Sequence, residues 1–440
     1  MSININDVFK KSIEDNYISN EEYTKWSVKK GLRNKDGTGV LIGLTRIADV
    51  VGYEMVDGVK CDAKGELLYR GIRLTEIAKH MNGKYGYEEI AFLIIFGHLP
   101  NRDELNEFAR IISDNYEIKP DFLKQKLLSN PCNNVMNKIQ TALLAMYEDD
   151  ENPDDSSVEN TLRQGLKIIA KFPAIICYAY ESKHHDLDGG SLIIHQMSKE
   201  KSVAENILCL LRPDQKYTRE EAELLDTVLV LHMDHGAGNN STFTDIVVSS
   251  TGTDLYSSIC AAVGSLKGPR HGGANKAVCH MMDAVIREVG LKASDEELEK
   301  VIHRILNKDF FDNSGLVYGI GHAVYTLSDP RAEILKEKVK LLYKDNLDAF
   351  NFFTRFEEVA KRVISKEKGK TVCANVDFYS GLVYSMLGIP EDLFTPMFAC
   401  ARVVGWVAHN IENKLYCNRI VRPAGKYVGE EYPYVEMEDR

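Results

Sequence analysis

The chain has 440 residues, of which 44% are hydrophobic, as expected for a large globular protein with one extensive core or two domains. Its formal net charge of −11 argues against a general affinity for nucleic acids or anionic membranes, although clustered arginines can still bind an anionic small molecule. The sequence contains neither an apolar run of membrane-spanning length nor an N-terminal hydrophobic signal segment, so we expect a cytoplasmic protein.

Strand signals are concentrated near the N-terminus, in residues 40–72. This stretch is rich in β-branched residues and is divided by Asp57-Gly58 and Lys64-Gly65, so it predicts one or two small hairpins. Strands and helices do not alternate along the chain, which argues against a doubly wound sheet. The acidic segment 148–157 predicts a solvated surface loop. The nine cysteines form no CxxC pair and predict reduced, mostly buried thiols.

Helical signals dominate the rest of the chain. Thr218 with Glu221, and Ser294 with Glu297, have the spacing of a capping box, in which each side chain bonds a free backbone N–H of the first helical turn. The first of these helices runs toward His232. The sequence therefore predicts a mainly α-helical protein with a few short β hairpins.

Three more elements are predicted toward the C-terminus. An apolar repeat over residues 352–364 has helical periodicity. Thr395 followed by Pro396 predicts the N-cap and first residue of a helix that carries Arg402 among apolar neighbours. The tail from 427 to 438 predicts an extended segment. A buried arginine needs an anionic partner or a ligand, so Arg402 is a candidate site residue.

Two histidines lie in the segment LHMDHGAGNNST, residues 231–242. His232 and His235 are three residues apart near one helical face, but the HExxH motif of zinc proteases and an evident third metal ligand are absent. We interpret His232 as a buried, hydrogen-bonded histidine, whereas the glycines after His235 favour a loop that turns its ring into a cleft. Asn239 and Ser241 can orient another ring.

His271 lies in the glycine-rich turn GPRHGGAN, near the start of a predicted helix. The helix dipole disfavours a charged imidazole there, so a neutral ring that donates a hydrogen bond is one interpretation and a purely structural loop histidine is the other. His322 lies in a similar turn, GIGHAVYTLSDPR. Arg331 follows it at a predicted helix start, where it either binds an anion or pairs with Asp329 or Glu333.

Asp377 lies in an apolar, aromatic setting in NVDFYSG. Partial burial raises the pKa of a carboxyl toward that of a general base, although an aspartate before an apolar segment is also a common N-cap. Arg422, in a loop beside Pro423, is uninformative alone.

The motifs GPRHGGAN, GIGH…DPR and NVDFYSG, in this order and at these separations, resemble those of the citrate synthase family over essentially the whole chain. The resemblance implies an all-helical homodimer of the tricarboxylic acid cycle. It further implies a large domain, residues 1–271 with 385–440, and a small domain, residues 272–384, that closes over the substrates.

The resemblance also implies an activity, in which acetyl-CoA and oxaloacetate condense and citryl-CoA is hydrolysed to citrate and CoA. Asp377 would then remove the methyl proton, His271 would stabilise the enol or enolate, and His322 would donate to the oxaloacetate carbonyl. No cofactor or metal is implied, because acetyl-CoA is a substrate. The sequence departs from the usual pattern of the family at Arg270 and Gly236. Both residues flank catalytic positions without replacing them, so we expect them to affect acyl preference or regulation.

Further roles follow from the same resemblance. Arg331, Arg402 and Arg422 would clamp the oxaloacetate carboxylates, with Arg422 reaching across from the partner subunit, and His235 would be another oxaloacetate contact. Supporting positions are His232, Asn239, Ser241 and Asn275. Candidate CoA contacts are Lys366, Lys368 and Lys370 for the phosphates, and Leu316, Val317 and Gly319 for the adenine end.

Three alternatives stay open at this point. A 2-methylcitrate synthase uses propionyl-CoA on the same fold, and one methylene changes the binding free energy by only about 1–3 kcal/mol. A non-catalytic regulator that binds CoA or a dicarboxylate would not need Asp377 and His271, which are both present. A histidine-based metalloenzyme would lose its activity on chelation.

Overall fold

The structure, a computed structural model, describes residues 4–34, 38–56, 59–81, 85–342, 347–417 and 419–440. The chain divides into two compact units. The main unit is Leu44–Ile420, and the terminal unit combines Met1–Gly43 with Val421–Arg440. The predicted division into domains 1–271 with 385–440 and 272–384 is a different one, and it stays a prediction.

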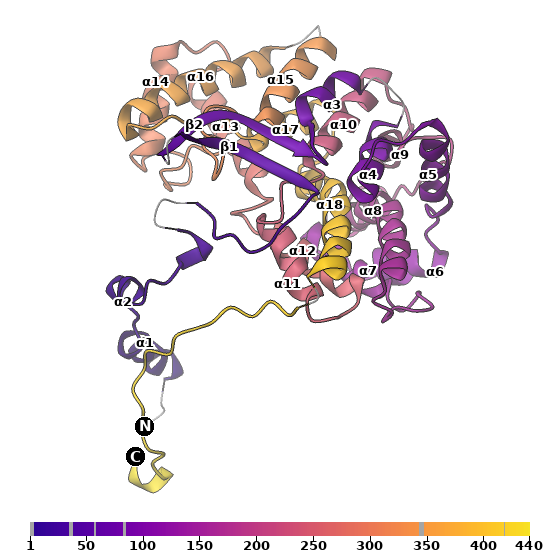
Figure 1. The fold of residues 1–440 in the computed structure, drawn as a ribbon. Helices are drawn as coiled ribbons and strands as arrows, with labels where there is room; N and C mark the ends of the chain where they lie inside the picture. Colours follow the sequence, from indigo (N-terminus) through magenta and orange to yellow (C-terminus); the bar gives the residue numbers. More distant parts are fainter. Residues whose placement is uncertain (1–3, 35–37, 57–58, 82–84, 343–346, 418) are drawn as a thin grey trace. The chain divides into compact units, whose positions relative to one another are not determined.

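The main unit is mainly helical, as predicted. In its first half, the other helices are arranged around the long helix α8 (Figure 1). Helix α8 packs against α18, α7, α9 and α5, and its central residues are almost all buried. The helices of this half are α3 (Leu74–His80), α4 (Gly86–Phe96), α5 (Arg102–Asp114), α6 (Pro120–Phe122) with a π-helical turn (Leu123–Leu128), α7 (Val135–Ala145), α8 (Val158–Asp186), α9 (Val203–Leu211), α10 (Arg219–His232), α11 (Asn240–Ser249) and α12 (Leu255–Leu266).

The second half of the main unit contains a group of helices that pack on one another: α13 on α17, α14 on α16, and α15 on α17. The last helix, α18, returns to pack against α8, α10, α11 and α12. The helices are α13 (Ala274–Val289), α14 (Asp295–Leu306), α15 (Pro330–Leu342), α16 (Asp348–Lys368), α17 (Val376–Met386), a 3-10 turn (Glu391–Leu393) and α18 (Phe394–Tyr416).

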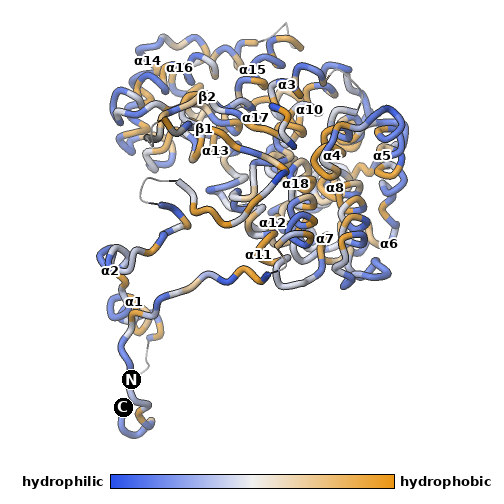
Figure 2. Tube along the Cα trace, viewed as in Figure 1, coloured by the Kyte–Doolittle hydropathy of each residue, from blue (hydrophilic) through white to orange (hydrophobic). Residues whose placement is uncertain are grey.

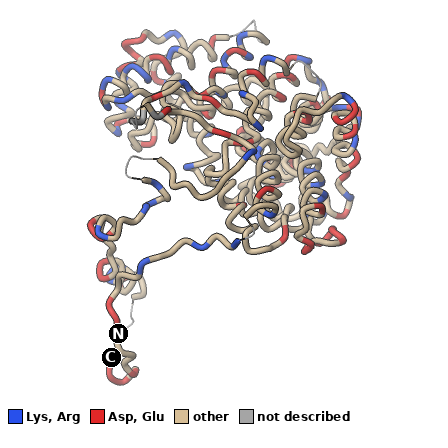
Figure 3. The backbone as a smooth tube through the Cα atoms, in the orientation of Figure 1, with Lys and Arg blue, Asp and Glu red and all other residues tan. Residues whose placement is uncertain are grey.

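Helix α18 is buried along most of its length. Its residues from Phe394 to Asn410 are apolar or small with few exceptions, and nearly all are buried. Figure 2 shows the hydrophobic residues along α18 and α8, and Figure 3 shows that charged residues gather on the outer helices instead. Arg402 is the one Arg, Lys, Asp or Glu side chain between Phe394 and Asn410. Its burial therefore calls for a specific reason.

A small antiparallel sheet of three strands, β1 (Ala48–Val56), β2 (Val59–Tyr69) and β3 (Ile72–Arg73), lies in the main unit. The prediction of one or two hairpins is confirmed. The second turn, however, is at Arg70-Gly71, where both residues have positive φ, as a tight hairpin turn requires. The predicted divider Lys64-Gly65 lies inside β2 instead, and Asp57-Gly58 lies outside the described residues.

Two glycines in this sheet have a packing role. A Cβ on Gly52 would be 2.3 Å from the carbonyl oxygen of Val324, and one on Gly65 would be 2.0 Å from that of Ser328. The Gly65 N–H donates to Ser328 Oγ at 3.2 Å, and the Thr326 hydroxyl donates to the Gly52 carbonyl at 3.3 Å. The sheet therefore supports the loop that carries His322.

Helix starts were predicted well where the signal is local. Both capping boxes are present, at Thr218 with Glu221 and at Ser294 with Glu297. Thr395 is not an N-cap, because α18 begins one residue earlier, at Phe394. Its hydroxyl instead donates to the Gly272 carbonyl at 3.0 Å, so it ties α18 to the turn after His271.

The acidic loop 148–157 is mostly exposed, but one of its carboxylates is buried. Asp150 accepts hydrogen bonds from Arg163 Nη2 at 2.5 Å and from the Tyr256 hydroxyl at 2.6 Å. These contacts hold its pKa at about 2 although burial alone would raise it. The prediction of a wholly solvated loop is therefore wrong at this residue.

The terminal unit contains α1 (Ile5–Asp15), α2 (Asn20–Lys25), and 3-10 turns at Lys30–Leu32 and Met437–Asp439. None of the residues of α1 or α2 is buried, and α1 exposes the apolar side chains of one face. The described residues of the predicted extended tail form no strand.

All nine cysteines are free thiols, as expected. Among the described residues, no helix combines the length and the apolar character that crossing a membrane demands.

Candidate active site

Arg402 is the centre of the candidate site. It is fully buried in α18, its Nε donates to the His232 carbonyl at 2.7 Å, and its guanidinium lies 4.8 Å from the centre of the Phe398 ring. Its Nη1 and Nη2 are buried without a hydrogen-bond partner among the described residues. Burial lowers its pKa to about 10, so the group remains charged. Buried charged donors without partners cost more than about 1–3 kcal/mol, which favours an anion at this point.

A metal pair at His232 and His235, the alternative that the sequence did not favour, gains no support from the contacts of His232. His232 ends α10, and its Nδ1 lies 2.8 Å from the Val228 carbonyl, as the interpretation of a buried, hydrogen-bonded histidine requires. Burial lowers its pKa to about 3. No group of three or more His, Cys, Asp or Glu side chains in the described part of the chain has the geometry to hold a metal ion.

His235 follows in a tight turn and lies beside His322. The ring centres are 5.2 Å apart, and Tyr325 stacks on His322 at 4.7 Å. The Nδ1 of His322 accepts the backbone N–H groups of Val324 and Tyr325 at 3.0 and 3.1 Å. An accepting Nδ1 places the proton of the neutral ring on Nε2. His322 is therefore set up as a donor through Nε2.

The loop of His322 is paired with the segment that precedes α17. The Gly321 N–H donates to the Cys373 carbonyl at 2.7 Å, and the Asn375 N–H donates to the Gly319 carbonyl at 2.9 Å. The Asn375 side chain also donates to the Gly321 carbonyl at 2.9 Å. These bonds connect the His322 loop to the start of the helix that carries Asp377.

Asp377 is the second residue of α17, and the interpretation as an N-cap is wrong. The N-cap is Asn375, whose side chain accepts the Asp377 N–H at 3.0 Å. The Asp377 Oδ1 is buried without a hydrogen-bond partner among the described residues. Burial raises the pKa of Asp377 to about 6, against the opposing effects of Arg331 and Arg402. Such a carboxylate is a competent base near neutral pH.

Arg331 forms the ion pair with Asp329 that the sequence left open. Its Nε and Nη2 donate to the two carboxylate oxygens at 3.0 and 2.7 Å, and both side chains are buried. Asp329 Oδ2 also accepts the Val376 N–H at 3.1 Å. Sequence reasoning had Asp329 only as an ion-pair partner, whereas it also joins Arg331 to the start of α17. The alternative partner Glu333 pairs with Lys336 at 2.7 Å.

His271 lies in the turn before α13, as predicted, and its Nε2 is 3.1 Å from Ser241 Oγ. Ser241 accepts a hydrogen bond from the Trp406 indole at 3.2 Å and lies 2.8 Å from Asn239 Oδ1. Burial, with a smaller effect of Arg402, lowers the pKa of His271 to about 4, so the ring is neutral. The sequence predicted a neutral ring because of the helix dipole, whereas the lowered pKa results from burial and Arg402.

The histidines and arginines form one electrostatic cluster. Burial first, and then the neighbours Arg331, His322, Arg402 and His271, lower the pKa of His235 well below its ordinary value. Trp406, Phe398 and Tyr325, which sequence reasoning missed, complete the surroundings of these rings. The Asn275 side chain is also buried, and its Oδ1 accepts the Lys276 N–H at 2.8 Å.

The contacts described above among the histidines and arginines do not include the remaining predicted site residues. Arg422 is exposed and belongs to the terminal unit. Lys366, Lys368 and Lys370 are exposed around the end of α16. Gly319 packs so closely that a Cβ would be 2.8 Å from Phe378 and from Val278, which gives this residue a packing role. Leu316 is exposed, Val317 is buried, and Arg270 is exposed.

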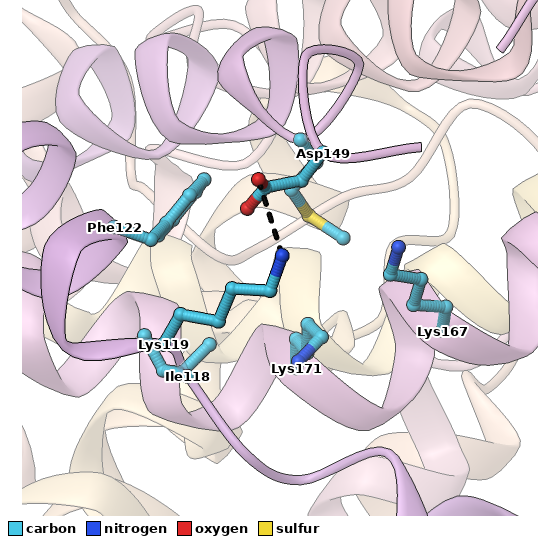
Figure 4. Close-up of a pocket in the computed structure, with 7 residues that line it drawn as sticks. Ile118, Lys119, Phe122, Asp149, Lys167 and Lys171 are labelled. Carbon is cyan, nitrogen blue, oxygen red and sulfur yellow. Dashed lines mark hydrogen bonds and ion pairs between the residues drawn. The ribbon is translucent and has the colours of Figure 1, made fainter. Parts of the chain in front are cut away.

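A separate surface pocket beside α6 and α8 contains none of these residues (Figure 4). Lys119 pairs there with Asp149 at 3.4 Å, and Lys167 and Lys171 line the same pocket. Burial lowers the pKa of Lys171 to about 8.

Comparison with known proteins agrees with this geometry. Residues 36–424 match the family described as citrate synthase, C-terminal domain. The chain is 34% identical to a citrate synthase from Deinococcus radiodurans over 94% of this chain and 99% of that one. It is 31% identical to a 2-methylcitrate synthase from Shewanella oneidensis, over 82% and 88%.

Solved structures give the same result. A citrate synthase from Thermoplasma acidophilum, solved as a ternary complex with carboxymethyl coenzyme A and oxaloacetate, superposes with a TM-score of 0.77 at 27% identity, over 94% of this chain and 99% of that one. The fold, the family match and the arrangement of the three sequence motifs agree, and the chain belongs to the citrate synthase family.

Proposed function

We propose that this enzyme condenses acetyl-CoA with oxaloacetate and hydrolyses the resulting citryl-CoA to citrate and CoA. One observation on this chain supports the proposal in addition to the family match. Several buried polar atoms have no hydrogen-bond partner among the described residues, namely Arg402 Nη1 and Nη2, Asp377 Oδ1 and His235 Nε2. A dicarboxylate and an acyl thioester supply the partners that these atoms need, namely anionic oxygens for Arg402 and an acidic C–H for Asp377.

The first step is removal of a proton from the acetyl methyl group by Asp377. Because the pKa of Asp377 is raised to about 6, its carboxylate is more basic than an ordinary aspartate and is still ionised at neutral pH. The electron pair of the broken C–H bond moves into the thioester, whose oxygen becomes negative. A neutral hydrogen-bond donor close to that oxygen stabilises the enolate, or transfers its proton to the oxygen to give the enol.

His271 is the proposed donor to the thioester oxygen. The Ser241 hydroxyl has one hydrogen, which either Asn239 Oδ1 or His271 Nε2 can accept. When Ser241 donates to Nε2, the proton of the neutral His271 ring lies on Nδ1, which then donates to the substrate. The Trp406 indole, which can only donate, fixes the position of the Ser241 oxygen.

The enol carbon then attacks the ketone carbon of oxaloacetate, and the new C–C bond leaves an alkoxide. His322 donates to this oxygen through Nε2, the nitrogen that carries the proton when Nδ1 accepts two backbone N–H groups. Arg331 and Arg402 bind the carboxylates, and His235 makes a further contact. Water finally attacks the thioester carbon of citryl-CoA, and CoA leaves as a thiol.

Several further features belong to the same proposal. The enzyme acts as a cytoplasmic homodimer, with Arg422 contributed by the partner subunit, and residues 272–384 close over the substrates. Lys366, Lys368 and Lys370 bind the CoA phosphates. The reaction uses no cofactor and no metal, and undiminished turnover after exhaustive chelation is the expected control result.

The test is a coupled thiol-release assay with oxaloacetate and a panel of short acyl-CoA substrates, with identification of the product acid. We expect the highest kcat/KM with acetyl-CoA and citrate as the product. The similarity to a 2-methylcitrate synthase favours propionyl-CoA as the second candidate. A higher kcat/KM with propionyl-CoA would assign that activity instead, and no thiol release with any acyl-CoA would favour a non-catalytic binding protein.

A further inference from the structure

One face of α18 holds the turn that carries His235. Arg402, Gly405 and His409 are three and four residues apart, so they lie along one side of the helix. At one end of this row, Arg402 Nε donates to the His232 carbonyl at 2.7 Å. At the other end, His409 Nε2 lies 3.1 Å from Asp234 Oδ2.

Between these two contacts the helix approaches the turn so closely that only glycine fits. A Cβ on Gly405 would lie 2.4 Å from the Met233 carbonyl oxygen and 2.4 Å from Asp234 Oδ2. The helix backbone is therefore in contact with the turn, which leaves the turn little freedom to shift along α18.

The side chain of Asp234 bonds to the backbone on the far side of His235. Its Oδ1 accepts the Gly236 N–H at 2.7 Å, so a hydrogen bond closes over the backbone of the residue between them. Gly236 has a φ of +77°, the left-handed conformation that this turn requires. One carboxylate oxygen of Asp234 thus fixes the His235 backbone, and the other faces His409.

The contact between Asp234 and His409 is buried on both sides, with 0% and 1% of the two side chains exposed. Burial alone would raise the pKa of Asp234, but His409 and Arg402 bring it below its ordinary value. The other nitrogen of His409, Nδ1, lies 3.8 Å from Glu412 Oε2, and Glu412 Oε1 accepts the Arg46 N–H at 2.8 Å. His409 is therefore held between two carboxylates.

A buried contact between a carboxylate and an imidazole imposes a specific geometry, because each polar group is costly to bury without the other. We propose that Asp234 and His409 are positioning residues, which hold the His235 ring where it contacts oxaloacetate. This inference rests on the proposed function. Without the His409 contact, the carboxylate of Asp234 is free to rotate away from the Gly236 N–H, and His235 loses its fixed backbone.

The consequence is a defect in binding one substrate. A displaced His235 weakens binding in the ground state and in the transition state alike, which raises KM and leaves kcat nearly unchanged. We expect His409→Leu, which removes the imidazole in contact with Asp234 and keeps most of the bulk, to raise the KM for oxaloacetate about tenfold, while the KM for acetyl-CoA stays within about twofold.

Two conservative variants sharpen the test. His409→Gln keeps an N–H that reaches Asp234 and is expected to restore most of the oxaloacetate affinity. Asp234→Asn keeps an oxygen for the Gly236 N–H but removes the charge, so its KM is expected to lie between those of His409→Gln and His409→Leu. Both changes preserve side-chain size, so they carry the test if His409→Leu does not fold.

Asn410→Ala is the matched control. Asn410 is the next residue of α18, is fully buried, and donates to Asp245 Oδ1 at 3.1 Å, away from the His235 turn. Its loss is expected to lower the melting temperature and to leave the oxaloacetate KM unchanged. If Asp234→Asn or His409→Leu has the wild-type KM, or if Asn410→Ala raises it equally, the positioning role is wrong. A wild-type enzyme without turnover would instead contradict the proposed function.

Discussion

Two arginines that we assign to the same substrate occupy contrasting parts of the chain. Arg402 is fully buried in the middle of α18, with its position fixed by the His232 carbonyl and the Phe398 ring. Arg422 is exposed in the terminal unit. The guanidinium of Arg402 is therefore held by contacts within the main unit, whereas the side chain of Arg422 is exposed.

The two units differ in the same way in their apolar residues. The main unit has an extensive buried core, whereas the terminal unit exposes Phe9, Trp26, Tyr427 and Tyr434 by 46–79%. Large apolar side chains that are exposed are typical of surfaces that contact another protein. We propose that a second subunit completes the terminal unit, in line with the role proposed for Arg422.

The largest expected effect is in the main unit. Asp377→Ala should lower kcat at least about a thousandfold, because no other group near the acetyl methyl is expected to replace the carboxylate as base. His271→Ala should lower kcat about a hundredfold or more, because the enolate loses its donor. Asp309→Ala, at an exposed position, is the control. Near-normal turnover of either site variant would show that the role of that residue is wrongly assigned.

The next effect concerns the two arginines. Arg402→Ala and Arg422→Ala should each raise the KM for oxaloacetate, by about a hundredfold for the buried Arg402 and by less for Arg422. Mixing Arg422→Ala with Asp377→Ala subunits should restore about a quarter of wild-type activity. Half of the dimers are mixed, and each mixed dimer has one intact site if Arg422 crosses the interface. No recovery in verified mixed dimers would place Arg422 in its own subunit's site.

The pH dependence is a smaller effect. Asp377 acts as a carboxylate, and its pKa is raised to about 6, so kcat/KM should be constant above pH 7 and fall below pH 6. At pH 5 it should be about a tenth of the plateau value, since about a tenth of the groups are ionised. His271 does not titrate in this range because its pKa is about 4. A profile that stays flat down to pH 5 would contradict Asp377 as the base.

The smallest effect should come from α1 in the terminal unit. Phe9→Ser removes an exposed apolar side chain, so kcat at high protein concentration should stay within about twofold, while activity should fall more steeply on dilution as the dimer dissociates. Lys10→Ser is the matched control on the same helix. Equal dilution curves for the two variants would show that Phe9 does not contact a partner subunit.

Local signals in the sequence predicted two of the helix starts correctly. The capping boxes at Thr218 and Ser294 each join groups within three residues, so the sequence alone specifies them. Thr395 had the same kind of signal and was misassigned, because its hydroxyl bonds the carbonyl of Gly272, 123 residues away. A cap is predictable only where no distant partner competes for the side chain.

The candidate site shows the same limit. The burial of Arg402 was predictable from its apolar neighbours. The ion pair of Arg331 with Asp329 was one of the alternatives that the sequence left open, because Glu333 is equally near along the chain. The contact of Trp406 with Ser241 joins residues 165 apart, and no local pattern marks it. Such contacts between helices decide which tautomer of a histidine is present, and they emerge only once the helices are packed.

The most direct test of the central claim is thiol release when oxaloacetate and acetyl-CoA are mixed with the wild-type enzyme and with Asp377→Ala. The account predicts turnover that requires both substrates in the wild type and none above background in the variant. Wild-type enzyme that releases no thiol, or a variant that releases it at the same rate, would contradict it.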